Sequence, residues 1–374
     1  MDTLDLPLPD ISPGMRMTLR EYTFGPKDAE RSIYLQAALH AGEVPGLLVI
    51  QHLLTMLESL EFARALTGRV TVMTWANPIG MQQFVGGTLT GRFDCAGSGN
   101  FDRRFPDIGS EVVQQFKAGN CPTNRDDAKY RLMEMAKPAE QGSDPVEYLK
   151  KILLWRAFAH DMVLDLHCDK TAVMHVYGNW AHERRAVSLS RCLKAPVLLL
   201  EDSAGGGTFD QSFHDAWSAL RQCGLRSGSR QGFAAVVELR GQRDVSDILA
   251  VRDAGALVDF LRIEGFVVDG QQPVRHEPPA ISALEAVDHL KATRTGIATW
   301  SVPVGTFVTR GAEIGVITGL TDGQAESRTV VRSSIDGILV ARMHVHFVLA
   351  GQRIAMIAGQ DKVPGRITGG LLPD

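Results

Sequence analysis

SIYLQAALHAGEVPG, residues 32–46, is the stretch that decides the fold. Its first half is apolar enough for a strand that is buried on both faces. The apolar run ends at His40 and Glu43, and Pro45 then suits the first turn of a helix, where its missing N–H group is not needed. The stretch therefore predicts a strand, a turn carrying a histidine and a glutamate, and a helix. In open α/β sheets, ligands bind on such turns at the carboxyl ends of the strands.

A second apolar run, VLDLHCD at 163–169, is also predicted to be a strand that ends at a histidine, His167. Imidazole and carboxylate groups are ligands that suit zinc. His40, Glu43 and His167, with a fourth position left to water, match the donor set of a catalytic zinc site. A lone histidine at a strand end is more often a hydrogen-bonded structural residue, so either strand alone is a weak signal.

Strands and helices alternate along the first two thirds of the chain. The predicted strands lie at 15–24, 32–39, 69–75, 162–167, 175–177, 196–200 and 234–239. The predicted helices lie at 44–65, 110–117, 126–137, 145–160, 183–193, 212–223 and 246–265. This alternation predicts an α/β fold with a mostly parallel or mixed sheet that has helices on both faces.

The sequence changes character near 273–279, where prolines and glutamines indicate a linker. Short β-type runs separated by glycine turns then follow, at 299–302, 306–308, 313–317, 328–332, 337–340, 346–349 and 352–357. We therefore predict two domains. Residues 1–285 would form the catalytic domain, and residues 286–374 would form a small all-β barrel or sandwich.

Two further features could take part in substrate binding or catalysis. A glycine-rich loop at 77–106 carries the adjacent arginines Arg103 and Arg104, whose guanidinium groups could bind a substrate carboxylate, although an isolated pair of loop arginines is otherwise solvated. Glu238 lies within an apolar strand, where desolvation would raise its pKa towards that of a general base. On the sequence alone, Glu238 could equally lie on the solvated face of an edge strand.

Composition excludes some partners. The formal net charge of −4 and the absence of a lysine/arginine block argue against nucleic acid and against anionic membranes. The five cysteines are scattered, which does not favour a disulfide framework and indicates a reducing compartment. No signal peptide and no membrane-spanning run are recognised. A cytoplasmic location is therefore expected, and a homo-oligomer is compatible with the sequence.

In their order and spacing, four motifs resemble the succinylglutamate desuccinylase/aspartoacylase family of zinc carboxypeptidase-like deacylases. The motifs are HAGE at 40–43, Arg92 with NFDRRFP at 100–106, His167, and Glu238. The resemblance covers about residues 31–265. It implies a zinc carboxypeptidase-like fold and one Zn²⁺ per chain, with His40, Glu43 and His167 as the ligands.

The resemblance also implies roles for the remaining motif residues. Glu238 would act as general base and acid, and Arg92 would polarise the scissile carbonyl. Asn100, Asp102 and Arg103 would lie where the family binds the substrate carboxylate. Asp102 departs from the family pattern, which usually has asparagine there, and an acid at this position could favour a substrate that bears an amine.

Other residues near these motifs are assigned by position alone. Tyr177 lies shortly beyond His167 and is predicted to line the substrate pocket, together with His175. His344 and His346 alternate on a probable strand of the second domain and are interpreted as structural.

The expected function is a zinc-dependent amidohydrolase acting on linear amides, which removes the acyl group from a small N-acyl amino acid or a related N-acylated amine. One alternative is a metallocarboxypeptidase acting on peptides or cell-wall fragments. A small terminal domain that narrows the cleft would disfavour such long substrates. A second alternative is a non-catalytic homologue that binds a metabolite, and the presence of every expected catalytic residue type argues against it.

Overall fold

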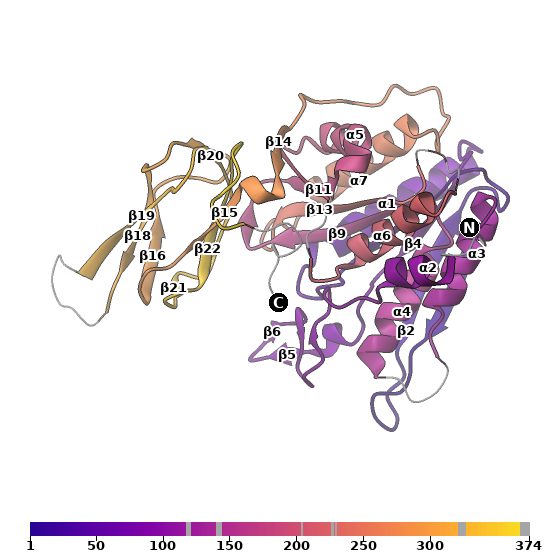
Figure 1. Ribbon diagram of the computed structural model, residues 1–374, viewed down its shortest axis with the longest axis horizontal. Coiled ribbons are helices and arrows are strands. Elements are labelled where there is room, and N and C mark those ends of the chain that lie inside the picture. The colour runs from indigo at the N-terminus through magenta and orange to yellow at the C-terminus, as the bar shows by residue number, and fades with distance from the viewer. Residues whose placement is uncertain are drawn as a thin grey trace.

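The computed structural model describes residues 1–116, 121–139, 144–202, 205–225, 228, 230–320 and 327–366. A large α/β domain lies beside a smaller domain built from the C-terminal strands (Figure 1). Within these ranges, no helix combines the length and the apolar character needed to cross a membrane.

The main sheet has nine strands among the described residues, in the order β1-β2-β4-β3-β9-β13-β11-β12-β14. Their bounds are β1 (Asp2–Pro7), β2 (Thr18–Phe24), β3 (Ser32–Ala37), β4 (Arg69–Met73), β9 (Met162–Asp169), β11 (His175–Asn179), β12 (Val197–Glu201), β13 (Phe233–Gly241) and β14 (Ala280–Ala283). The central pairs β4-β3, β3-β9 and β9-β13 are parallel, whereas β1-β2, β2-β4 and β13-β11 are antiparallel. The sheet is therefore mixed, and the predicted fold class is confirmed.

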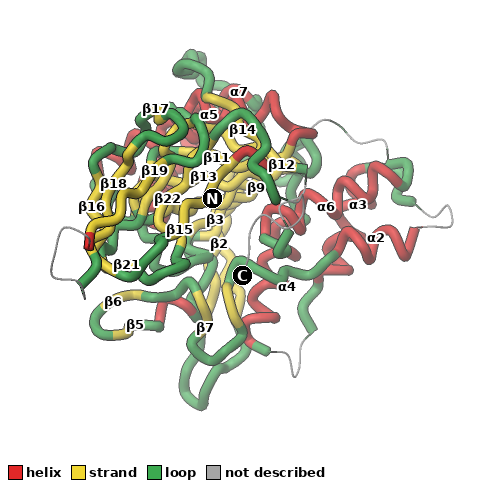
Figure 2. The backbone as a smooth tube through the Cα atoms, turned by 60° about the vertical axis from the view of Figure 1, so that its left-hand side comes forward, coloured by secondary structure: helices red, strands yellow, loops and turns green. Residues whose placement is uncertain are grey.

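Helices cover both faces of this sheet (Figures 1 and 2). One layer contains α1 (Pro45–Phe62), α5 (Glu183–Leu193) and α7 (Asp247–Ile263). The other contains α2 (Ile108–Phe116), α3 (Arg125–Ala136), α4 (Pro145–Ala157) and α6 (Phe209–Gln222). The predicted end of the α2 helix at Lys117 lies outside the described residues.

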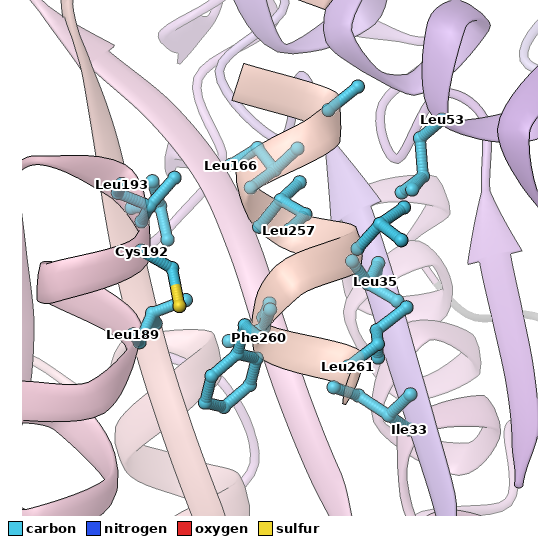
Figure 3. Packing of buried hydrophobic residues seen from close by; sticks show 14 of the residues in the cluster. Ile33, Leu35, Leu53, Leu166, Leu189, Cys192, Leu193, Leu257, Phe260 and Leu261 are labelled. Atoms are coloured by element: carbon cyan, nitrogen blue, oxygen red, sulfur yellow. The ribbon is translucent and has the colours of Figure 1, made fainter. Parts of the chain in front are cut away.

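Alternate side chains of the central strands enter the two cores. Leu35 of β3 and Leu166 of β9 belong to the same buried cluster as Leu53 of α1, and Leu257 and Phe260 of α7 also pack there (Figure 3). Tyr34, the residue before Leu35 on β3, is fully buried in the opposite cluster. Both faces of β3 are thus covered, which explains its unbroken apolar run.

The smaller domain contains two antiparallel sheets among the described residues, ordered β10-β20-β22-β15, with β17 also paired to β20, and β19-β18-β16-β21. The bounds are β10 (Thr171–Ala172), β15 (Val287–Lys291), β16 (Gly296–Trp300), β17 (Phe307–Val308), β18 (Glu313–Thr318), β19 (Arg328–Arg332), β20 (Gly337–Arg342), β21 (Phe347–Val348) and β22 (Arg353–Ala358). β10 precedes the small domain in sequence, yet it pairs with β20. This pairing connects the two parts of the chain directly.

Outside the loop at 77–106, four strands of the described residues were not predicted: β1 at the edge of the main sheet, β10, β14 and β15. β1 has mostly exposed side chains, so it lacks the apolar run that marks the central strands. The strand predicted at 299–302 lies earlier in the sequence than expected: β16 begins at Gly296 and ends at Trp300. The predicted long loop instead contains short hairpins, formed by β5 (Phe84–Val85) with β6 (Thr88–Leu89) and by β7 (Phe93–Asp94) with β8 (Gly99–Asn100).

Candidate active site

The carboxyl ends of β3 and β9 bring three potential metal ligands together. The two strands are parallel neighbours, so the turn after β3 lies beside the end of β9. Ala38 has a φ of +59°, a left-handed backbone conformation, where the chain leaves β3. His40 and Glu43 follow on this turn, and His167 lies near the end of β9. Strand order thus unites residues that are far apart in sequence.

One nitrogen of each histidine faces the glutamate. His40 Nδ1 lies 3.1 Å from Glu43 Oε1, and His167 Nδ1 lies 3.0 Å from Glu43 Oε2. One donor atom from each of the three residues lies within 4.8 Å of the others. All three side chains are buried, so water does not replace these contacts. The spacing and the donor types fit a divalent metal ion such as zinc.

The opposite ring nitrogens are fixed by other residues. His40 Nε2 lies 2.8 Å from Asn100 Oδ1, which also accepts a hydrogen bond from the Asp102 N–H group. His167 Nε2 lies 3.0 Å from Asp165 Oδ2. An oxygen atom that faces Nε2 of each imidazole favours the tautomer with its proton there, and this tautomer leaves the Nδ1 lone pair for a metal. This outer layer supports the assignment of the three residues as ligands.

The electrostatics of the cluster favour a positive charge at its centre. Burial and the nearby Arg92 lower the pKa of His40 to about 4, so its ring is neutral, as metal ligation requires. Burial alone would lower the pKa of His167, but Asp165 and Glu43 raise it well above its ordinary value. Burial alone would likewise raise the pKa of Glu43, but His40 and His167 hold it well below the usual range.

Glu238 and Arg92 lie beside this cluster. Glu238 is the register partner of His167 in the β9-β13 pair, and its Oε2 atom is buried without a hydrogen bond to any described residue. Burial and the charge of Glu43 raise the pKa of Glu238 to about 8. Arg92 Nη1 lies 3.0 Å from Glu43 Oε1 and 3.3 Å from His40 Nδ1. A proton acceptor and a cation therefore lie beside the three proposed ligands.

A cavity of about 350 Å³ opens onto these residues. It is lined by eight of the predicted site residues: His40, Arg92, Asn100, Asp102, Arg103, His167, Tyr177 and Glu238. Glu43 and His175 do not line it. The prediction for His175 is wrong, because its ring is fully buried and its Nδ1 atom lies 2.9 Å from Val173 O. Asp102 also has a structural contact, because its Oδ1 atom accepts a hydrogen bond of 3.0 Å from Phe209 N at the start of α6. Burial raises the pKa of Asp102 to about 6. The Tyr177 hydroxyl donates to Met356 Sδ at 3.7 Å.

No protein-family model and no curated protein matches the sequence, whereas solved structures match it over nearly its whole length. A protein from Shewanella amazonensis assigned to the succinylglutamate desuccinylase/aspartoacylase family has a TM-score of 0.83 at 24% identity, covering 96% of this chain and 98% of that chain. The chain has the aspartoacylase fold.

More distant structures share this fold. A succinylglutamate desuccinylase/aspartoacylase from Rhodobacter sphaeroides has a TM-score of 0.64 at 16% identity, covering 96% of this chain and 94% of that chain. The product-bound ectoine utilization protein EutE (DoeB) from Ruegeria pomeroyi has a TM-score of 0.65 at 14% identity, again covering 96% and 94%. At these identities the likeness establishes the fold of the chain.

In this aspartoacylase fold, sequence reasoning missed the part of the cavity wall that comes from the smaller domain. His289, Arg342, Arg353 and Met356 line the cavity from β15, β20 and β22. The available signal was a charged residue at one end of an apolar run, as in GILVAR at 337–342 and RIAMIA at 353–358. Such runs are common, so this signal alone does not identify a site.

Lys150 of α4 was also missed. Its ammonium group donates to Arg103 O at 2.6 Å and to Asn100 O at 3.3 Å, and it lies 5.9 Å from the centre of the Phe105 ring. The side chain is 5% exposed, and burial lowers its pKa. Lys150 thus fixes the loop that carries Asn100 and Arg103.

Proposed function

We propose that the chain is a zinc-dependent deacylase of the succinylglutamate desuccinylase/aspartoacylase family, which hydrolyses the amide bond of a small N-acyl amino acid or related N-acylated amine. The observation that carries the proposal is the buried cluster of His40, Glu43 and His167 beside Glu238, whose Oε2 atom has no hydrogen bond to any described residue. A metal centre next to a carboxylate with a raised pKa is an arrangement suited to hydrolysis.

Each residue has a role in this proposal. His40, Glu43 and His167 would hold one zinc ion per chain, and when bound the ion supplies Lewis acidity and lowers the pKa of a nearby water towards about 7. Glu238 takes a proton from the attacking water and returns it to the nitrogen that leaves. Arg92 is placed to hold the scissile carbonyl oxygen and to stabilise the negative charge that develops on it. The products are a carboxylic acid and an amine.

The dimensions of the cavity support a small substrate. Its volume of about 350 Å³ is near the lower limit for ligand pockets, about 300–1,000 Å³. The C-terminal domain closes one side of the cavity, which disfavours the alternative of a carboxypeptidase acting on long peptides. A cytoplasmic location fits the five cysteines, all of which are free thiols.

Metal analysis combined with a substrate screen tests this proposal. We expect about one zinc per chain in the purified protein, loss of that zinc in a His40→Ala variant, and hydrolysis of at least one N-acyl amino acid by the unaltered protein only. His346→Ala is the matched control. His346 belongs to the C-terminal domain, where its Nδ1 atom lies 2.7 Å from Ala298 O of the same domain. Absence of metal from the unaltered protein, even after zinc is added, would refute the proposal.

A further inference from the structure

Arg353 is a cation of the C-terminal domain that lines the cavity. It is the first residue of β22, in the C-terminal domain, and its side chain is partly buried. Its guanidinium group forms no hydrogen bond or ion pair with any residue in the described ranges. It lines the same cavity as His40 and His167, the two histidines among the proposed metal ligands. A partly desolvated guanidinium is costly unless an anion or hydrogen-bond acceptors satisfy it.

Arg103 approaches the cavity from the other domain. Its side chain is 9% exposed, and its Nη1 atom donates to Asp102 O at 2.6 Å and lies 3.4 Å from Asp102 Oδ2. The Nε atom is buried and has no hydrogen-bond partner among the described residues. The Asp102 carboxylate already accepts a hydrogen bond from Phe209 N. Arg103 therefore keeps donor capacity for a ligand in the cavity.

The two guanidinium groups act on each other. Burial lowers the pKa of Arg353, and the positive charges of Arg366 and Arg103 lower it further, against only a weak opposing effect of Tyr177. Like charges held close together in a partly desolvated cavity repel each other. A carboxylate between them would remove this repulsion and could accept paired hydrogen bonds from a guanidinium group.

We infer that Arg353 determines substrate specificity. From the C-terminal domain it joins Arg103, which the family resemblance already places at the substrate carboxylate, and together they bind that carboxylate in a subsite that spans the two domains. The inference rests on the proposed function for the identity of the substrate, an N-acyl amino acid with a carboxylate remote from the scissile amide. That carboxylate has two sources, the amino acid itself or a dicarboxylic acyl group, and both would present the same chemistry.

Kinetics on four related substrates separate the two sources. N-acetyl-L-methionine and its carboxamide differ only in the carboxylate of the amino acid, and N-succinyl-L-methioninamide and N-butyryl-L-methioninamide differ in the carboxylate of the acyl group. For the substrate whose carboxylate occupies the subsite, Arg353→Met should raise KM about 10- to 100-fold with little change in kcat, because a charge-assisted pair is lost equally from the ground and transition states. Its uncharged counterpart should be unaffected.

Two further variants control this experiment. Arg353→Lys keeps the charge and should restore part of the lost affinity. Arg332→Met removes an arginine of the same domain that donates to Gly311 O and does not line the cavity, so it should leave KM unchanged. If Arg353→Met does not fold, as judged by thermal unfolding, Arg353→Gln replaces it in the same comparison.

Calorimetric titration with succinate and with L-methionine gives a readout that does not need turnover. Arg353→Met should weaken the binding of one of them at least tenfold. Hydrolysis together with unchanged KM and binding in this variant would overturn the inference but leave the proposed function. Weakened binding without hydrolysis of any substrate would overturn the proposed function but leave the subsite. Neither hydrolysis nor binding by the unaltered protein would overturn both.

Discussion

At the scale of single residues, the site depends on which polar atoms already have a partner. Asn100 and Asp165 lie against the Nε2 atoms of His40 and His167, so the Nδ1 atoms of both rings face Glu43. His40, Glu43 and His167 could be predicted from the sequence because each stands at or beside the end of an apolar strand. The roles of Asn100 and Asp165 behind the rings could not, because the sequence does not indicate which way an imidazole turns.

Glu238→Gln should separate catalysis from stability. Above its ordinary pKa of 4.5 and up to its native value of about 8, Glu238 holds a proton in the folded protein that the unfolded chain releases. Stability of the metal-free protein is therefore lost as pH rises through this window. Glutamine cannot ionise, so metal-free Glu238→Gln should be more stable than the unaltered metal-free protein at pH 8, by at least about 1 kcal/mol. The two should be equally stable near pH 4.

Urea unfolding of both metal-free proteins at the two pH values measures this difference. In the same variant, turnover should fall by about 10²- to 10⁴-fold while zinc remains bound, as expected for loss of a general base. Equal stability at both pH values would show that the carboxylate is not desolvated. Unaltered turnover would remove Glu238 from the mechanism.

At the scale of elements, burial decided what the sequence could predict. The central strands carry continuous apolar runs, and the helices on both faces carry periodic apolar residues. The predicted bounds of these strands and helices lie close to the observed ones. β1, with mostly exposed side chains, and β14, a four-residue strand next to the linker, have no such pattern. The contact of α4 with the active-site loop was also hidden, because a lysine in a helix is usually solvated.

Lys150→Met should impair catalysis through the loop that Lys150 holds. Without the ammonium group, the carbonyls of Asn100 and Arg103 lose their donor, so the side chains that contact His40 and line the cavity become less well positioned. We expect kcat/KM to fall roughly tenfold or more. Lys129→Met is a suitable control, because Lys129 is also largely buried but pairs with Asp161 at 2.9 Å, away from the cavity.

The control variant should lose stability while keeping kcat/KM. The measurements are steady-state kinetics and thermal unfolding of both variants. The positioning role of Lys150 would be contradicted if Lys150→Met lowered the unfolding temperature but left kcat/KM as it was.

At the scale of the whole molecule, the cavity exists only because two domains meet. The small domain was predicted as a unit that narrows the cleft, but the residues that it contributes to the site were not predicted, since Arg353 lies 250 positions beyond Arg103 in the sequence. Contacts over such a separation leave no local pattern. The division into residues 1–285 and 286–374 remains a prediction. The packing between the two parts indicates whether they unfold together or separately.

A single unfolding transition is expected for the two domains. Val197 and Leu199 of β12 share one buried cluster with Val287, Val340 and Met356 of the C-terminal strands, and β10 pairs with β20. Separating the domains would expose this cluster to water, at a cost of about 25 cal/mol for each Å² of apolar surface. Neither part should therefore unfold while the other remains folded.

Differential scanning calorimetry tests this cooperativity. We expect one peak whose calorimetric enthalpy equals its van't Hoff enthalpy, the criterion for a two-state transition. Met356→Ala, which removes a side chain from the shared cluster, should shift the whole peak to lower temperature rather than split it, because the lost packing supports both domains. Two resolved peaks in the unaltered protein would instead show that the domains are energetically independent. The cavity would then be formed by a separable lid.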